Sequence, residues 1–180
     1  MLESEEYLDI LDNEGNFTNT VKTRELAHRL GLWHRTVHIW VVNDDGQVLL
    51  QLRAPTVHSD PNRWDISSAG HIPAGESSRS GAVRELQEEL GIYTQEDKLV
   101  FLFVNKHEII CENICDRAFN DIYLLQANIN IDELTLQKEE VAAVKWLPWQ
   151  ELLTLAKQPD VVDHTYEYNC LYKILEKTYK

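Results

Sequence analysis

Residues 70–92 constrain this chain more than any other part of its sequence. Between residues 78 and 90, apolar side chains recur at the spacing of one helical face, and Gly91 follows as a helix stop. A turn of about 100° per residue places Glu85, Glu88 and Glu89 together on another face of this helix. Taken alone, three such carboxylates are most simply a solvated acidic face. They also repel one another unless a cation compensates them, and hard oxygen ligands suit Mg²⁺ or Mn²⁺.

The rest of the chain predicts strands mixed with a few helices. Asp44, Asp45 and Gly46 form a strong hairpin signal between two β-rich runs, and an Asn- and Gly-containing cluster at residues 12–16 predicts another hairpin near the N-terminus. We expect strands at residues 7–11, 20–23, 36–43, 47–53, 66–71, 98–107, 120–129 and 141–146. We expect helices at residues 24–30, 78–90, 148–156 and 166–180. Several strands joined by hairpins indicate an α+β fold.

Composition limits the classes of function. The chain has 180 residues, 43% of them hydrophobic, with 30 acidic against 17 basic side chains and a net charge of −13. This charge argues against binding to a nucleic acid polymer or a membrane surface, because both require a basic face. The acidic opening lacks the apolar core of a secretory signal, and the longest apolar run, residues 99–104, is too short to span a membrane. With only three cysteines, we expect a cytoplasmic domain without a disulfide scaffold.

The spacing of Gly70, Glu76, Arg84 and the residues that follow forms a longer pattern, G-x5-E-x7-R-E-(apolar)-x-E-E-x-G-(apolar). This pattern resembles the Nudix box at every defined position. The resemblance implies the Nudix fold, a mixed β-sheet sandwiched between α-helices, and hydrolysis of a diphosphate bond that depends on Mg²⁺ or Mn²⁺. The bound cations of such a site neutralise phosphate oxygens and prepare a water molecule to attack phosphorus.

The same resemblance assigns roles to the charged residues of the box. Glu85, Glu88 and Glu89 are expected as metal ligands and catalytic residues, while Glu76 and Arg84 are expected to hold the loop and helix in register. A fourth carboxylate from outside the box is common in the family. The candidates for it are Asp121, Glu139 and Glu140.

Three further stretches, residues 32–40, 50–54 and 64–71, resemble type I isopentenyl-diphosphate isomerase and its hydrolase-like cousins. In the isomerases, histidines matching His28, His34 and His71 bind a metal together with two glutamates. Those glutamate positions fall here at Phe119 and Asp121. We therefore expect His34 and His71, with Arg53, to contribute to a second metal site or to contact the substrate.

Two departures disfavour isomerisation. Ala69 stands where the isomerases have a catalytic cysteine, and alanine has no thiol to move a proton at carbon. The isomerases also have a basic residue at the position of Glu85, so their Nudix box is incomplete, whereas the box of this chain is complete. The leading hypothesis is a Nudix pyrophosphohydrolase acting on a nucleoside di- or triphosphate or another nucleoside diphosphate derivative. A prenyl diphosphate is the alternative substrate, and a catalytically silent nucleotide sensor is the alternative of another class.

The domain organisation follows from the resemblance and the hairpin signals. Residues 1–30 are expected to form an N-terminal β-hairpin extension and a short helix packed on the core, and residues 31–180 the Nudix hydrolase domain. The expected partner is a small-molecule diphosphate. Nudix proteins commonly oligomerise, so the prediction includes a homodimer.

Overall fold

The computed structural model describes residues 6–111 and 114–179. Its strands are β1 Tyr7–Leu11, β2 Phe17–Thr23, β3 His34–Val42, β4 Gln47–Arg53, β5 Trp64–Asp65, β6 Ser68–His71, β7 Leu99–Cys111, β8 Ile114–Gln126 and β9 Val141–Pro148. Its helices are α1 Arg24–Leu30, α2 Ser78–Leu90, α3 Leu152–Leu155 and α4 Thr165–Tyr179, with short 3-10 turns at Glu96–Lys98, Ile131–Glu133 and Trp149–Glu151. Among the described residues, no helix is long and apolar enough to span a membrane.

Seven strands form one mixed sheet, and the N-terminal hairpin β1–β2 forms a second, two-stranded sheet. Strands β3 and β8 run parallel and pair from His34 to Val42, whereas the other strand pairs of the large sheet are antiparallel. This arrangement confirms the predicted α+β class and the mixed sheet.

The large sheet splits between β3 and β4. These two strands share one register pair, Val42 with Val48, and then diverge. Beyond that point β6 pairs with β3, while β5 and β9 pair with β4. Ser67, between β5 and β6, joins the two halves because its hydroxyl donates to Leu49 O at 2.6 Å and accepts from Val41 N at 2.8 Å. The split opens a wedge within the sheet, and the candidate site lies in it.

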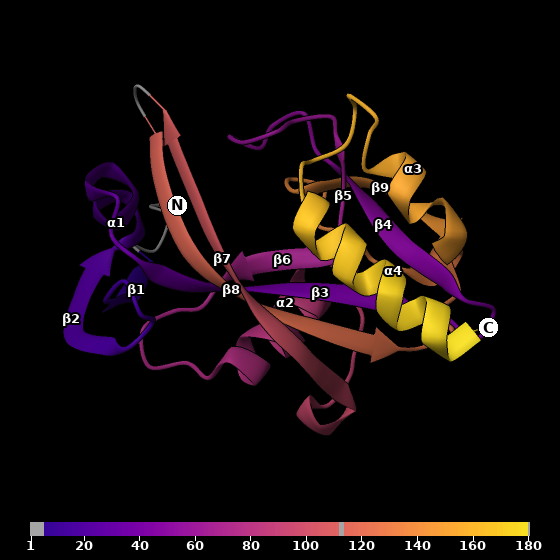
Figure 1. Cartoon of the computed structure of the whole chain (residues 1–180), viewed down its shortest axis with the longest axis horizontal. Coiled ribbons are helices and arrows are strands. Elements are labelled where there is room, and N and C mark those ends of the chain that lie inside the picture. The colour runs from indigo at the N-terminus through magenta and orange to yellow at the C-terminus, as the bar shows by residue number, and fades with distance from the viewer. Residues whose placement is uncertain (1–5, 112–113, 180) are drawn as a thin grey trace.

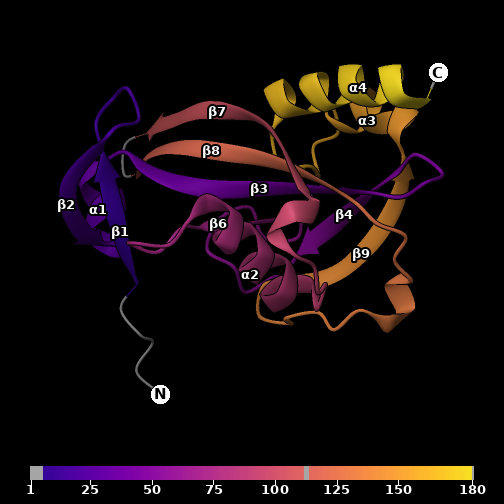
Figure 2. The same ribbon diagram turned by 90° about the horizontal axis from the view of Figure 1, so that it is seen from below.

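Helices cover both faces of the sheet, as Figures 1 and 2 show: α2 lies on one face, and α3 and α4 lie on the other. The two faces correspond to two buried clusters. Leu86 and Leu90 of α2 pack with Val37 and Ile39 of β3 in one of them. Trp40 of β3 packs with Leu171 and other apolar residues of α4 in the second. Alternate residues of β3 therefore point to opposite helices, as the two-residue period of a strand requires.

The N-terminal hairpin and α1 lie at one end of the large sheet (Figure 2). Leu8 and Ile10 are buried against Ala27 of α1, and the Leu11 N–H donates to Trp33 O at 2.8 Å. Thr23 begins α1 by accepting from Leu26 N, and Gly31 ends it in a left-handed conformation. The predicted hairpin and helix are confirmed, with β2 beginning three residues earlier than expected.

The β7–β8 hairpin is longer than the sequence indicated. We expected its strands to end at residue 107 and to begin at residue 120, but they extend to Cys111 and from Ile114. The additional length projects beyond the core as a two-stranded ribbon, so it lacks the apolar alternation that signals a half-buried strand. Glu108 and Arg117 stabilise it across the strands with an ion pair. The predicted strand at residues 66–71 is shorter in the structure, where β6 covers Ser68–His71, and a separate two-residue strand, β5, precedes it at Trp64–Asp65.

Candidate active site

Helix α2 begins and ends where its sequence specifies. The Ser77 side chain accepts from Ser80 N at the start, which satisfies one of the free N–H groups of the first turn. Gly91 ends the helix with a φ of 70°, a left-handed conformation that glycine adopts at low cost. The apolar side of α2 is buried in the core. Its carboxylate side therefore has a fixed orientation toward the wedge.

Arg84 organises the charged residues around this helix. Its guanidinium contacts Glu76 Oε2 at 3.1 Å, Glu85 Oε1 at 2.8 Å and Glu88 Oε2 at 2.8 Å. It also donates to the backbone carbonyl of His71 at 3.0 Å. A planar guanidinium with five donors suits this arrangement of several acceptors. The contacts support the expected role of Glu76 and Arg84 in fixing the loop to the helix.

Glu85 is held in a narrow space beside β6. A Cβ atom added at Gly70 would collide with the Glu85 carboxylate, so any larger residue at this position would displace that carboxylate. Burial raises the pKa of Glu85 to about 7, with smaller contributions from Glu88 and Glu140, although Arg84 acts in the opposite direction. A carboxylate at this position is costly to ionise without a cation nearby.

Glu89 is more deeply buried, with 4% of its surface exposed. It accepts hydrogen bonds from Ala69 N at 3.3 Å and from the Gln51 amide at 3.4 Å. Burial, followed by the charge of Glu85, raises its pKa well above the ordinary value. The second polar atom of the Gln51 amide, Oε1, is buried without a hydrogen-bond partner among the described residues. Two buried carboxylates beside an unpaired amide oxygen form a donor set that fits a hard divalent cation.

The three candidates for a fourth carboxylate lie in different surroundings. Glu140 lines the same cavity as the box glutamates. Glu139 is exposed and does not line that cavity; Thr56 bonds to its backbone carbonyl. Asp121 is buried and accepts two hydrogen bonds from the Arg35 guanidinium, at 2.9 and 3.0 Å. Since the Asp121 carboxylate is already paired with Arg35, Glu140 is the best candidate for the fourth carboxylate from outside the box.

Three histidines that are far apart in the sequence come together next to this site. His28, His34 and His71 offer ring nitrogens within 4.8 Å of one another, and the Nε2 atoms of His28 and His71 lie 3.1 Å apart. Burial lowers the pKa of all three, so their imidazoles are neutral at pH 7 and able to act as ligands.

Asp116 is the carboxylate beside these histidines, and the sequence did not point to it. Its Oδ1 lies 3.7 Å from His34 Nε2 and 3.8 Å from His28 Nε2. Neither Asp116 Oδ1 nor His34 Nε2 has a hydrogen-bond partner among the described residues, although both atoms are buried. Phe119, where the isomerase comparison placed a ligand, instead packs against Trp33. The carboxylate beside the histidines thus comes from Asp116, three residues before the expected position at Phe119.

The box glutamates, His71 and Asp116 line one cavity of about 670 Å³, whereas His28 and His34 lie behind His71 and do not line it. Arg53, named from the sequence, lies on its wall and pairs with Asp65 at 3.1 Å. His38 and His164 also line it and were not expected from the sequence. The lining is dominated by charged and polar side chains, so the cavity suits a polar, anionic ligand.

The family model described as NUDIX domain matches residues 32–167, three quarters of the chain. The chain belongs to the Nudix family. This Nudix chain is 41% identical over 171 residues to "Nudix hydrolase 3" of Arabidopsis thaliana, an alignment that covers 92% of the chain and 22% of the plant protein. It therefore spans about a fifth of that relative's length. It is also 40% identical to an uncharacterised Nudix hydrolase of Clostridium acetobutylicum, over 82% of the chain and 72% of that protein.

The fold of this Nudix domain is similar to the crystal structure of DR0079 from Deinococcus radiodurans. The TM-score is 0.69 at 20% identity, over 97% of this chain and 100% of that chain. An isopentenyl-diphosphate delta-isomerase of Photorhabdus laumondii is 28% identical over 87% of the chain and 86% of that protein. The Nudix fold, the hydrolase family and the resemblance to the isomerases are thus confirmed.

Proposed function

We propose that this Nudix domain hydrolyses a diphosphate bond in a nucleoside di- or triphosphate or another nucleoside diphosphate derivative. The observation that carries the proposal is the placing of Glu85, Glu88, Glu89 and Glu140 on one wall of a polar cavity. Two of these carboxylates are buried enough to raise their pKa values, so the wall attracts a divalent cation when they ionise.

Glu85, Glu88 and Glu89 would hold Mg²⁺ or Mn²⁺, with Glu140 as the fourth carboxylate. When bound, a divalent cation supplies positive charge to the diphosphate oxygens and a water able to attack phosphorus at neutral pH. The chain's own residues prepare this site. Arg84 fixes the carboxylates of Glu85 and Glu88, and Ala69 N and the Gln51 amide hold the carboxylate of Glu89.

The polar lining favours a nucleotide-like substrate over a prenyl diphosphate. The apolar side chains on the cavity wall are those of Ala69, Ile109, Ala118 and Val162. Such a small apolar area gives little burial to a hydrocarbon chain, whose binding depends on apolar surface. The prenyl alternative is supported by the isomerase-like histidine cluster and by the identity to the Photorhabdus isomerase.

The test is metal-dependent phosphate release from nucleoside di- and triphosphates, nucleotide sugars, dinucleotides and prenyl diphosphates. A coupling phosphatase or pyrophosphatase is added where the primary product requires one. We expect turnover of a nucleotide-type substrate with Mg²⁺ and its loss in Glu89→Gln. Turnover of prenyl diphosphates alone would select the alternative. Silence across the panel from a folded protein that binds metal would favour the sensor and contradict the hydrolase.

We also propose a second metal site at the histidine cluster. His34 and His71, with His28 and Asp116, would supply three neutral nitrogens and one carboxylate oxygen, a donor set that suits a transition metal. Binding of one equivalent of Mn²⁺ that is lost in His71→Gln but retained in Glu89→Gln would support it. A single equivalent lost only in Glu89→Gln would contradict it.

The proposal includes a small-molecule diphosphate partner and a cytoplasmic location, and it retains the homodimer expected from the family. The acidic charge of −13 supports the absence of a nucleic acid partner. Sedimentation at several concentrations measures the oligomeric state, and a monomer at every concentration would refute the homodimer.

A further inference from the structure

A second group of buried ionic residues lies on the cavity wall outside the Nudix box. Asp65 of β5 is 3% exposed and accepts three hydrogen bonds. The donors are His164 Nε2 at 2.9 Å, Arg53 Nη1 at 3.1 Å and Ile66 N at 2.8 Å. A carboxylate with three donors stays ionised despite burial, and it fixes the positions of the two side chains bonded to it.

His164 carries a positive charge in this arrangement. Burial alone would lower its pKa, but the carboxylates of Asp65, Glu167 and Asp163 raise it to about 9. One carboxylate, Asp65, thus lies between two cations, His164 and Arg53, while Glu167 and Asp163 add negative charge on the other sides of His164. The titratable and charged groups that face His164 come from several elements: His38 of β3, Arg53 of β4, Asp65 of β5, His107 of β7, Asp163 before α4 and Glu167 in α4.

A second ionic pair, His38 with Glu167, lies beside His164. His38 Nδ1 lies 3.0 Å from both carboxylate oxygens of Glu167, which also accepts from the Asn105 amide at 2.9 Å. His38, His164 and Glu167 are close enough to ligate a metal ion. However, Glu167 is already bonded by His38 and Asn105, and His164 by Asp65. Charge pairing within the protein therefore accounts for the cluster without a cation.

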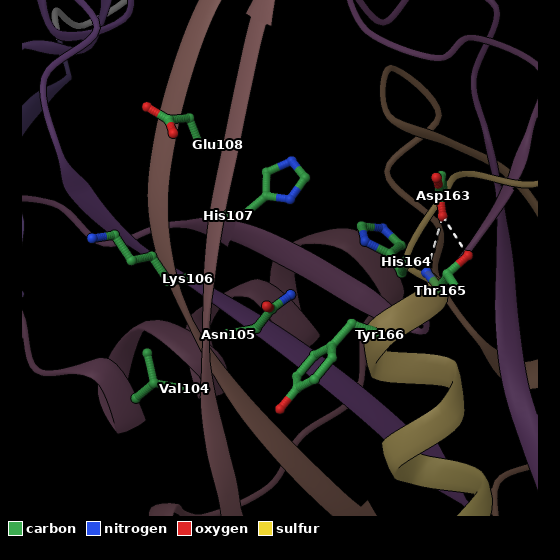
Figure 3. A pocket seen from close by; sticks show the side chains of 9 residues that line it. All are labelled: Val104, Asn105, Lys106, His107, Glu108, Asp163, His164, Thr165 and Tyr166. Atoms are coloured by element: carbon green, nitrogen blue, oxygen red, sulfur yellow. Dashed lines mark hydrogen bonds between the residues drawn. The ribbon is translucent and has the colours of Figure 1, made fainter.

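The position of His164 separates it from the box glutamates. Helix α2 and the start of α4 lie on opposite faces of the sheet (Figure 2), yet both contribute to the same cavity through the split between β3 and β4. One wall thus carries the carboxylates of Glu85, Glu88 and Glu89, and another carries the cations His164 and Arg53 on either side of Asp65. Figure 3 shows His107 of β7 and His164, just before α4, facing one another across a groove of about 620 Å³, and both residues also line the larger cavity.

We propose that His164, positioned by Asp65 beside Arg53, is a specificity-determining residue that binds the second phosphate group of the substrate. This inference rests on the proposed hydrolase function, in which the box glutamates hold the reacting phosphate through a cation. A second phosphate carries its own negative charge and requires a separate positive partner, which the imidazolium provides by a charge-assisted hydrogen bond. Asp65 is a positioning residue, since it acts through His164. Substrates with two linked phosphates are preferred over monophosphates.

The test measures binding without turnover. Methylenediphosphonate, a diphosphate analogue that resists hydrolysis, is titrated with Mg²⁺ into the wild-type chain and into His164→Gln, with inorganic phosphate as the single-phosphate probe. The Kd for the diphosphonate is expected to rise about ten- to hundredfold in the variant, the range for losing a hydrogen bond to a charged group. The Kd for inorganic phosphate is expected to change by less than about threefold. His107→Gln is the matched control, because His107 lines the same cavity beside His164.

A pH series separates a binding role from a structural one. Wild-type affinity for the diphosphonate is expected to fall as the pH rises through about 9, where His164 loses its proton. We expect this fall in affinity to be absent in His164→Gln and to occur at lower pH in Asp65→Asn. If His164→Gln fails to fold, the ring resonances of His164 in the wild-type chain replace it, and they are expected to shift when diphosphonate is added.

Each outcome decides the proposal. Equal diphosphonate affinity in wild type and folded His164→Gln would overturn the subsite and leave the hydrolase intact. Equal losses in His164→Gln and His107→Gln, or unmoved His164 resonances on ligand addition, would also overturn it. No diphosphonate binding by the wild-type chain with Mg²⁺ would overturn both the subsite and the proposed function.

Discussion

Neutralising Glu85 is expected to stabilise the metal-free protein above neutral pH. The carboxylate is largely buried, with 12% of its side chain exposed, and its pKa is about 7 in the folded chain against 4.5 for the unperturbed group. A raised folded-state pKa means that stability is fully present below the unfolded value and is lost as the pH rises through the folded value. Ionised Glu85 thus destabilises the metal-free chain at alkaline pH.

The size of the expected gain in stability follows from the shift in the pKa of Glu85. The difference between 4.5 and about 7 corresponds to about 3 kcal/mol once both states are ionised, at ~1.4 kcal/mol per pH unit. Glu85→Gln removes this cost, while Arg84 keeps its contacts with Glu76 and Glu88. We expect the variant to be about 3 kcal/mol more stable than wild type at pH ~8 and about equal to it at pH ~4, below the unfolded-state pKa of 4.5.

The assay is urea unfolding in the presence of a chelator, followed by the fluorescence of the five tryptophans. Glu88→Gln is the matched control, because 53% of the Glu88 side chain is exposed and its charge remains in water. The control is expected to change stability by less than about 0.5 kcal/mol at either pH. A Glu85→Gln variant that is no more stable than wild type at the higher pH would refute the reasoning from burial.

Three further results are expected. Gly70→Ala should reduce turnover at least about a hundredfold in a phosphate-release assay, because the added Cβ displaces the Glu85 carboxylate. Gly81→Ala is the control and should retain activity, since its Cβ would lie 3.3 Å from Glu76 Oε2. Equal activities of the two variants would contradict the prediction. Asp121→Asn should lower the free energy of unfolding by roughly 3 kcal/mol, because it leaves the Arg35 guanidinium half-buried without its charged partner, and urea unfolding measures the loss. Removing divalent cations with a chelator should abolish turnover and Mg²⁺ should restore it; turnover that persists in the chelator would exclude the proposed role of the box glutamates.

The box helix could be predicted from the sequence almost residue by residue. Its apolar spacing, the Gly91 stop and the carboxylates are all local signals, and the observed helix, Ser78–Leu90, has the predicted limits. The strand at residues 47–53 was also predicted with its observed limits, because a hairpin signal precedes it. Local rules suffice where turn chemistry and apolar periodicity agree.

The long ribbon of β7 and β8 and the positions of Asp116 and His164 were not predictable in this way. Asp116 approaches the histidines only because β8 pairs in parallel with β3, with His34 opposite Ala118. His164 reaches the cavity only because the segment before α4 returns to β5, where Trp64 pairs with Val161. Both contacts depend on register between segments far apart in the chain, which no local pattern encodes.

The buried polar residues were the least visible from the sequence. Asp65 and Glu167 resemble ordinary surface acids in composition, yet they are 3% and 0% exposed. Their partners, Arg53 and His164 for one and His38 for the other, come from other elements of the fold. Glu167 is four residues from Leu171, and helical periodicity does place it on the buried side of α4. That position was a signal that a buried charge with a partner should be sought there.

The single register pair at which β3 and β4 meet divides the strands around the cavity into two groups. One side, β3 with β6 and β8, supports the box helix, and the other, β4 with β5 and β9, carries Arg53 and Asp65. The box glutamates thus rest on one group of strands, and Arg53 and Asp65 belong to the other, while Ser67 and the Gln51–Glu89 hydrogen bond link the two groups. With this division, substitutions at the proposed phosphate contacts would leave the backbone support of the proposed cation ligands in place.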